Sequence, residues 1–173
     1  MTPGTVFLDR DGVLNRKAPE GDYVTTPGEV EVLPGAPEAL ARLNAAGARV
    51  VVVTNQRGVA RGRMTLSDLD AVNARLAALL APSRWDALYS CPHEGGACDC
   101  RKPGTGLFEQ ARAADPAIDF ADAAMVGDSP SDMQAGRALG LRTVLVGGGR
   151  GGGELADAVV PDLAAAVDRL VRG

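Results

Sequence analysis

The sequence predicts an α/β fold, a single doubly wound, Rossmann-like parallel sheet with helices on both faces. Short aliphatic runs alternate along the chain with segments of helical periodicity, which is the order of a parallel α/β sheet. Residues 49–54 contain four consecutive valines, a pattern typical of a strand buried on both faces. Aromatic residues make up only 3% of the chain, so an aliphatic core is required.

Six strands are expected, the last of them a short edge strand. They cover residues 6–8, 49–54, 87–89, 124–126, 143–146 and 157–160. The only low-complexity segment, residues 147–153, holds six glycines around Arg150. It lacks the Gly-Lys-Ser/Thr ending of a phosphate-binding loop, so we interpret it as a mobile surface loop.

Helical periodicity separates the strands and follows the last one. The first helix begins at Pro37 and can end at Gly47. The third and fourth cover residues 105–113 and 131–139, and Asp162 caps the fifth. The second begins at Thr65 with a capping-box variant and ends before Pro82. Its buried face is expected to consist of Leu69, Val72, Leu76 and Leu79.

Length and composition limit the classes of function. A chain of 173 residues can form one domain with its own core, so we expect a single domain over residues 1–173. We also expect the protein to be a monomer. The net charge of −4 argues against a nucleic-acid partner. No apolar run is long enough to cross a bilayer, and residues 1–4 do not resemble the start of a secretion signal. We therefore expect a cytoplasmic protein without a membrane partner.

Polar residues follow three of the predicted strands. Asp9-Arg10-Asp11-Gly12 follows the first, Thr54-Asn55-Gln56 ends the second, and Gly127-Asp128-Ser129 ends the fourth. Parallel strands bring these ends to one edge of the sheet, where ligands bind in open α/β folds. Clustered carboxylates resist ionising together unless a cation lies among them, and Mg²⁺ prefers oxygen ligands. Taken singly, Asp9 could be a loop cap and Asp128 a turn residue; together they favour a magnesium site that takes a small phosphorylated metabolite.

These residues resemble the signatures of the haloacid dehalogenase superfamily. The segment Asp9 to Asn15 resembles the first motif, Thr54 the second, Lys102 the third, and the segment Gly127 to Asp132 the fourth. The resemblance implies that Asp9 attacks phosphorus and that Asp11 is the acid/base. Mg²⁺ would be held by Asp9, Asp128 and the main-chain carbonyl of Asp11. Thr54 and Lys102 would hold the phosphoryl oxygens, and Asp132 would orient Lys102 or a metal-bound water.

A cysteine-rich loop, residues 91–100, carries a second signal. It contains Cys91, His93, Cys98 and Cys100, which are all the cysteines and the only histidine of the chain. Three thiolates and one imidazole make a closed tetrahedral set for Zn²⁺, and no ligand position is left open for catalysis. We therefore expect one structural zinc ion.

Residues 91–100, called the zinc loop below, narrow the resemblance to the heptose bisphosphate phosphatases and the related histidinol-phosphate phosphatases. Those proteins lack a large cap domain. The resemblance implies removal of the C7 phosphate of a heptose 1,7-bisphosphate, with Arg101 and Arg61 holding the second phosphate. Residues 15–23 would form a substrate-facing loop. The expected substrate contacts are Arg10, Asn15, Asn55, Gln56, Arg61 and Arg101.

Three alternatives remain open at this point. Histidinol phosphate or another small metabolite could be the substrate on the same scaffold. A zinc-bearing nucleic-acid module is a different class of protein, against which the acidic charge counts. A catalytically inactive binding protein is disfavoured because every expected catalytic residue is present.

Overall fold

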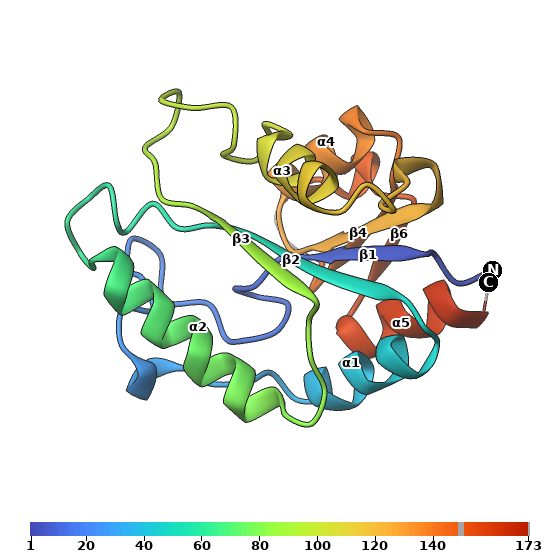
Figure 1. The fold of residues 1–173 in the computed structure, drawn as a ribbon, viewed down its shortest axis with the longest axis horizontal. Helices are drawn as coiled ribbons and strands as arrows, with labels where there is room; N and C mark the ends of the chain where they lie inside the picture. The colour runs from blue at the N-terminus through green and yellow to red at the C-terminus, as the bar shows by residue number, and fades with distance from the viewer. Residues whose placement is uncertain (149–150, 173) are drawn as a thin grey trace.

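Within the described residues, six parallel strands form one sheet in the order β3-β2-β1-β4-β5-β6 (Figure 1). The computed structural model describes residues 1–148 and 151–172. The strands are β1 (Thr5–Leu8), β2 (Arg49–Asn55), β3 (Ala87–Cys91), β4 (Ala123–Gly127), β5 (Arg142–Val146) and β6 (Ala158–Val160). The order reverses between β1 and β4, and such a reversal opens a crevice beyond the carboxyl ends of the two strands.

Five α-helices of the described chain cover the two faces of this sheet, as Figure 1 shows. They are α1 (Ala36–Ala45), α2 (Leu66–Leu80), α3 (Gly106–Ala114), α4 (Pro130–Ala138) and α5 (Leu163–Arg172). The predicted fold class is confirmed, including the lack of a large cap. In the described part of the chain, none of the helices is both long and apolar enough to span a bilayer.

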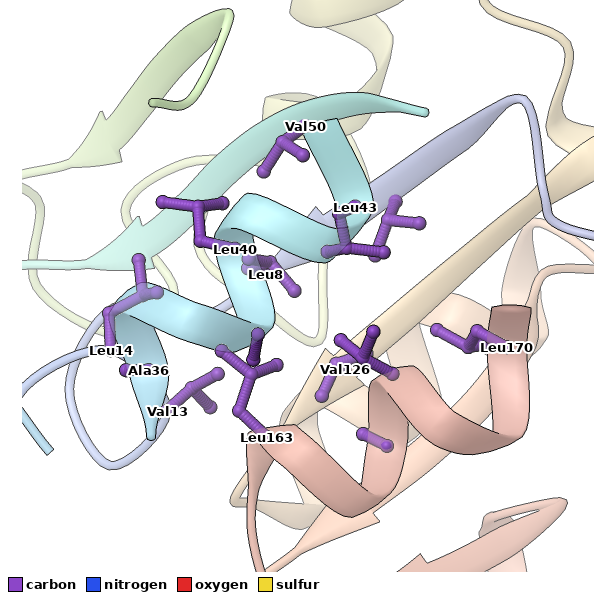
Figure 2. Close-up of a cluster of buried hydrophobic side chains, with 14 of the residues drawn as sticks. Leu8, Val13, Leu14, Ala36, Leu40, Leu43, Val50, Val126, Leu163 and Leu170 are labelled. Carbon is purple, nitrogen blue, oxygen red and sulfur yellow. The ribbon is translucent and has the colours of Figure 1, made fainter. Parts of the chain in front are cut away.

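The strands bury side chains on both faces because successive residues point in opposite directions. Val50 and Val52 join a core cluster with α1, α5 and the end of α2, while Val51 and Val53 join a second cluster with α3 and α4. Figure 2 shows the first cluster, in which Leu40 of α1 and Leu163 of α5 meet side chains of the sheet. The four-valine run is thus a strand buried on both faces, as predicted.

Most predicted helix ends are confirmed. Thr65 and Asp68 form a capping box at the start of α2, and Asp162 accepts a hydrogen bond from the amide of Ala165 at 2.8 Å. Gly47 and Gly140 follow α1 and α4 with φ of 75° and 73°, a conformation that glycine adopts without strain.

The predicted buried face of α2 was wrong at one residue. Leu79 is 37% exposed, and Leu80 is fully buried in its place. Steps of four residues lead from Val72 through Leu76 to Leu80, which keeps the apolar stripe facing the core. The prediction of a mobile loop at residues 147–153 includes residues 149 and 150, which lie outside the described residues.

Candidate active site

The ends of β1, β2 and β4 meet at a cleft of about 270 Å³. Asp9 directly follows β1, and its amide donates to the carbonyl of Val126 in β4 at 2.9 Å, which ties the two strand ends together. Asp128 follows β4. The cleft is lined by Asp9, Asp11, Lys17, Ala18, Asp22, Tyr23, Val24, Asn55, Gln56, Arg101, Lys102, Asp128, Ser129, Ser131 and Asp132.

A buried lysine lies between two carboxylates at the base of the cleft. Lys102 Nζ lies 3.0 Å from Oδ1 of Asp9 and 2.6 Å from Oδ1 of Asp132, and it donates to the carbonyl of Val53 at 2.7 Å. Asp132 uses its other oxygen, Oδ2, to accept from the amides of Asp128 and Ser129. Asp132 therefore holds Lys102, which is one of the two roles that the resemblance implied for it, and it also holds the start of α4.

Burial and charge set the protonation of these groups. Burial raises the pKa of Asp9 to about 7. The positive charge of Lys102 lowers this pKa, whereas the negative charges of Asp132, Asp128 and Asp11 also raise it. Burial alone would lower the pKa of Lys102, but Asp132 and Asp9 together raise it. Lys102 thus stays a cation beside a carboxylate that is only partly ionised at neutral pH. An additional positive charge near Asp9 would favour its ionised form.

Asp11 is held by three donors. Its Oδ1 accepts from Asn15 Nδ2 at 2.9 Å and from Arg10 at 3.2 Å, and its Oδ2 accepts from Gln56 Nε2 at 2.8 Å. Gln56 also donates to the hydroxyl of Thr54 at 2.8 Å. Gln56 lines the cleft, whereas Arg10 and Asn15 are each 1% exposed and do not. Of the predicted catalytic residues, Asp9, Asp11 and Lys102 line the cleft, whereas Thr54 is 1% exposed and is linked to the cleft through Gln56. Two predicted substrate contacts, Arg10 and Asn15, lie behind Asp11.

The carboxylates at the base of the cleft fit a divalent cation. One oxygen each of Asp9, Asp128 and Asp132 lie within 4.8 Å of one another. Oδ1 of Asp132 pairs with Lys102 and its Oδ2 accepts three hydrogen bonds, whereas Oδ1 of Asp128 is buried and has neither an ion pair nor a hydrogen bond with the described residues. Gly12 has φ of 87°, and a Cβ there would collide with the Asp128 carboxylate. Oxygen donors of this kind suit Mg²⁺, with Asp9 and Asp128 as the side chains that have lone pairs to offer.

Lys17 reaches the cleft from the loop after β1. Its Nζ lies 2.7 Å from Oδ2 of Asp128, although its side chain is 57% exposed. Burial raises the pKa of Asp128, and the contact with Lys17 works against that rise. Several residues of the loop predicted to face the substrate line the cleft, among them Lys17, Asp22 and Tyr23.

Arg101 and Asn55 line the cleft, whereas Arg61 does not line it but hydrogen-bonds with Tyr23, which does. Nη1 of Arg101 is buried and has no hydrogen-bond partner among the described residues. Asn55 holds the backbone of Lys102 at two points, with both hydrogen bonds 3.0 Å long. Arg61 Nε instead pairs with Glu94 of the zinc loop at 3.2 Å. Of the two arginines predicted to share the second phosphate, Arg101 lines the cleft and Arg61 does not.

The four predicted zinc ligands converge. Cys100 Sγ lies 3.0 Å from Cys91 Sγ, 3.2 Å from Cys98 Sγ and 3.2 Å from His93 Nδ1. All four ligand atoms lie within 4.8 Å of one another. Ligands about 2.3 Å from a tetrahedral zinc ion would lie about 3.8 Å apart, so the cluster is compact enough for one ion.

The thiols of this cluster differ in their acidity. A hydrogen bond from Cys100 lowers the pKa of Cys98 to about 6, whereas burial raises the pKa of Cys91 and of Cys100. Three thiolates this close would repel one another, and a bound dication removes that repulsion. The donor set and its spacing therefore fit zinc.

Two residues near the site were not among the predicted site residues. Lys17 lies 111 residues before Asp128, and Asn73, in the middle of α2, accepts a hydrogen bond from Arg10 at 2.7 Å. Neither residue belongs to a motif, and only the folded chain brings each to its partner. A positive charge in a loop predicted to face the substrate was the one available hint for Lys17.

Comparison with known proteins agrees with this site. A family model described as haloacid dehalogenase-like hydrolase matches residues 6–73, and one described as HAD-hydrolase-like matches residues 99–170. The D-glycero-beta-D-manno-heptose-1,7-bisphosphate 7-phosphatase of Pseudomonas aeruginosa is 40% identical over 154 residues, which cover 87% of this chain and 85% of the relative. The corresponding alpha-anomer phosphatase of Mycobacterium tuberculosis is 40% identical over 161 residues, with coverage of 88% and 84%.

A solved structure shares the whole fold. The D,D-heptose 1,7-bisphosphate phosphatase of B. bronchiseptica, crystallised with magnesium and phosphate, superposes with a TM-score of 0.87. It is 35% identical, and the match covers 97% of this chain and 98% of that one. The chain therefore belongs to the haloacid dehalogenase-like hydrolases, in the family of phosphatases that includes the heptose-1,7-bisphosphate 7-phosphatases.

Proposed function

We propose that this protein is a Mg²⁺-dependent phosphatase that removes the C7 phosphate of D-glycero-D-manno-heptose 1,7-bisphosphate. The observation that carries the chemistry is the group of Asp9, Asp11, Lys102 and Asp128 at one cleft. The substrate is supported by the relatives, which are named for this bisphosphate and cover nearly the whole chain. The cleft, about 270 Å³, has room for a small phosphorylated sugar.

The reaction follows from the positions of the two carboxylates after β1. Asp9 attacks phosphorus, the bond between phosphorus and the sugar oxygen breaks, and Asp11 gives its proton to that oxygen. Asp11 then takes a proton from water, which attacks the aspartyl-phosphate, and inorganic phosphate leaves with Asp9 restored. Lys102, fixed by Asp132, stabilises the negative charge on the transferring phosphoryl oxygens. Thr54 would complete the binding of these oxygens.

Two metals support this function in different ways. Mg²⁺, held by Asp9, Asp128 and the main-chain carbonyl of Asp11, would neutralise charge between the nucleophile and the phosphoryl group. Zn²⁺, held by the four ligands of the zinc loop, would order the segment that leads into Arg101 and Lys102. Its closed ligand set gives it a structural role.

The second phosphate of the substrate calls for a further cation among the residues that line the cleft. Arg101 supplies one, since its buried Nη1 has no partner among the described residues. Asn55 lines the same cleft and fixes the backbone of Lys102. Gln56 lines the cleft as well but already bonds Asp11 and Thr54, so a substrate contact from it would be additional. Action as a monomer in the cytoplasm remains a prediction from the sequence.

Phosphate release from a panel of substrates tests the proposal. The panel holds both anomers of the heptose bisphosphate, histidinol phosphate and fructose 1,6-bisphosphate. Both anomers are needed because relatives named for either one are 40% identical to this chain. One heptose anomer should have the highest kcat/KM. A higher value for histidinol phosphate would assign the protein to that alternative, and no Mg²⁺-dependent release from any of them would overturn the proposal.

A further inference from the structure

A buried arginine behind the cleft is paired on both sides. Arg10 is 1% exposed and is the largest of the fully buried side chains in the described structure. Its Nη1 donates to Oδ1 of Asn73 in α2 at 2.7 Å. Its Nη2 lies 3.2 Å from Oδ1 and 3.1 Å from Oδ2 of Asp11. The guanidinium therefore joins the middle of α2 to the carboxylate proposed as the acid/base.

Burying this charge is costly for the fold. A guanidinium taken out of water requires compensation from an opposite charge and from hydrogen bonds. Arg10 has the charge of Asp11 and the amide of Asn73, but its buried Nε finds no partner among the described residues. An apolar side chain of similar size would avoid this cost, which points to a role in the reaction.

We propose that Asn73 and Arg10 are positioning residues that hold Asp11 in the orientation needed for proton transfer. The proposal rests on the function of Asp11 in the proposed reaction. Asn73 fixes one end of the guanidinium, and the other end spans both oxygens of Asp11. Asn15 and Gln56 complete the set of donors, so that rotation of the carboxylate is opposed from each side. Arg10 acts through Asp11, because it does not line the cleft.

The distinguishing property of such a role is its dependence on the leaving group. An alkyl phosphate ester needs a proton on its leaving oxygen, whereas p-nitrophenyl phosphate releases a stable anion without one. A poorly oriented Asp11 should therefore slow the first step for the alkyl ester and spare it for the aryl ester. General destabilisation of the protein would instead lower kcat/KM for both esters equally.

The experiment compares Asn73→Leu with Asn73→Asp on glycerol 2-phosphate and p-nitrophenyl phosphate. Asn73 is partly exposed, so its replacement disturbs the core less than replacement of Arg10. Asn73→Leu removes the acceptor and should lower kcat/KM for the alkyl ester by about 10-fold, a part of the 10²- to 10⁴-fold that acid–base catalysis contributes. In the same variant, kcat/KM for the aryl ester should change by less than about 2-fold, since its leaving group departs without a proton from Asp11. Asn73→Asp keeps an acceptor oxygen. It should therefore return the ratio of kcat/KM for the alkyl ester to kcat/KM for the aryl ester toward the wild-type value.

The matched control is Asn44→Leu. Asn44 also makes two side-chain hydrogen bonds, both to the backbone of Arg84 and both 3.0 Å long, in a region that does not line the cleft. An unchanged ratio in Asn73→Leu, or the same change in Asn44→Leu, would overturn the inference while leaving the phosphatase assignment intact. A wild-type enzyme inactive on both esters and on the sugar panel would overturn the proposed function and this inference with it.

Discussion

Lys102 Nζ lies 3.0 Å from Oδ1 of Asp9, although 93 residues separate the two in sequence. The carbonyl of Val53 and the carboxylate of Asp132 hold the same ammonium group. Lys102 therefore cannot turn away from Asp9 without losing other buried contacts. A positive charge is fixed beside the proposed nucleophile before any substrate enters, which is the preorganisation that phosphoryl transfer requires.

Asp9→Asn should reduce phosphate release to background while the protein stays folded. The amide has the shape of the carboxylate, but it cannot attack phosphorus. Turnover and circular dichroism on the same preparation check both statements. Asp115→Asn is the matched control, because it removes a carboxylate paired with Arg49 and should keep turnover. Substantial activity in purified Asp9→Asn would contradict the nucleophilic role.

The same substitution should stabilise the Mg²⁺-free protein in a pH-dependent way. The pKa of Asp9 rises from 3.8 to about 7 on folding, so the folded state binds the extra proton. The raised pKa of Asp9 makes a contribution to the free energy of unfolding of the wild type that is fully present below about pH 4. This contribution is lost as the pH rises through about 7. Asn carries no charge, so the advantage of Asp9→Asn should grow by about 2–3 kcal/mol between roughly pH 5 and pH 8.

Urea unfolding of both proteins at the two pH values measures this difference. The buffer should lack Mg²⁺ but contain no chelator, because a chelator would also remove zinc. Saturating Mg²⁺ should narrow the gap at the higher pH, since a cation between Asp9 and Asp128 favours the ionised carboxylate. A constant difference across this pH range would show that burial does not hold the proton on Asp9.

Arg101→Ala should reduce the preference for a bisphosphate over the matching monophosphate. Arg101 lines the cleft and has a buried donor free of partners among the described residues, so it can take a second phosphate. Loss of a charged hydrogen bond of about 1.5–3 kcal/mol corresponds to about 10- to 100-fold in kcat/KM. Hydrolysis of p-nitrophenyl phosphate should change much less, because that ester has no second phosphate.

Arg61→Ala provides the comparison for this measurement. The sequence predicted that Arg61 shares the second phosphate, but in the structure its guanidinium pairs with Glu94. The preference for the bisphosphate should therefore stay near the wild-type value in Arg61→Ala. An equal loss in both variants would mean that Arg61 leaves Glu94 when substrate binds.

The sequence was sufficient for the sheet and for the strand ends because both depend on local pattern. A run such as Val50 to Val53 can only be buried on two faces, and Asp9 and Asp128 directly follow such runs. The direction of a side chain in the loop after a strand depends on the folded backbone. Arg10 stands between Asp9 and Asp11 in the sequence, yet its side chain is 1% exposed and does not line the cleft. Its partner Asn73 lies 63 residues away, a contact that no local pattern specifies.

Lys17→Met should strengthen Mg²⁺ binding. Lys17 neutralises Asp128 through a contact of 2.7 Å, and a metal ion has to share that carboxylate. The gain should be about 5-fold in Kd, because the Lys17 side chain is 57% exposed and an ion pair at a protein surface is worth up to ~1 kcal/mol. Isothermal titration calorimetry with MgCl₂ measures it on the substrate-free protein, and Lys17→Arg, which keeps the charge, should bind Mg²⁺ like the wild type. Weaker binding in Lys17→Met would show that the contact supports the metal site.

Loss of zinc should lower activity without unfolding the domain. Cys100 belongs to the metal cluster, and two residues later Lys102 enters the cleft, where Asn55 holds its backbone at two points. Structural zinc contributes on the order of 10 kcal/mol to ordering its ligands in small peptides. Here the core on one face of the sheet contains none of the ligands, and the core on the other face contains only Cys91 and Cys100 among many aliphatic and aromatic side chains. Zinc removal should therefore loosen the approach to Arg101 and Lys102.

We predict one zinc ion per chain, and a fall in both zinc content and kcat in Cys98→Ser and Cys100→Ser. A displacement of catalytic groups by about 1 Å can cost up to about 100-fold in rate, so a loss of about 10- to 100-fold is expected. Added Mg²⁺ should not rescue these variants, because it prefers oxygen ligands. Asp99→Asn is the control, since Asp99 lies in the same loop outside the ligand cluster. Metal analysis with kinetics decides the matter: full activity without zinc, or zinc retained after all three cysteines are replaced, would refute the coupling.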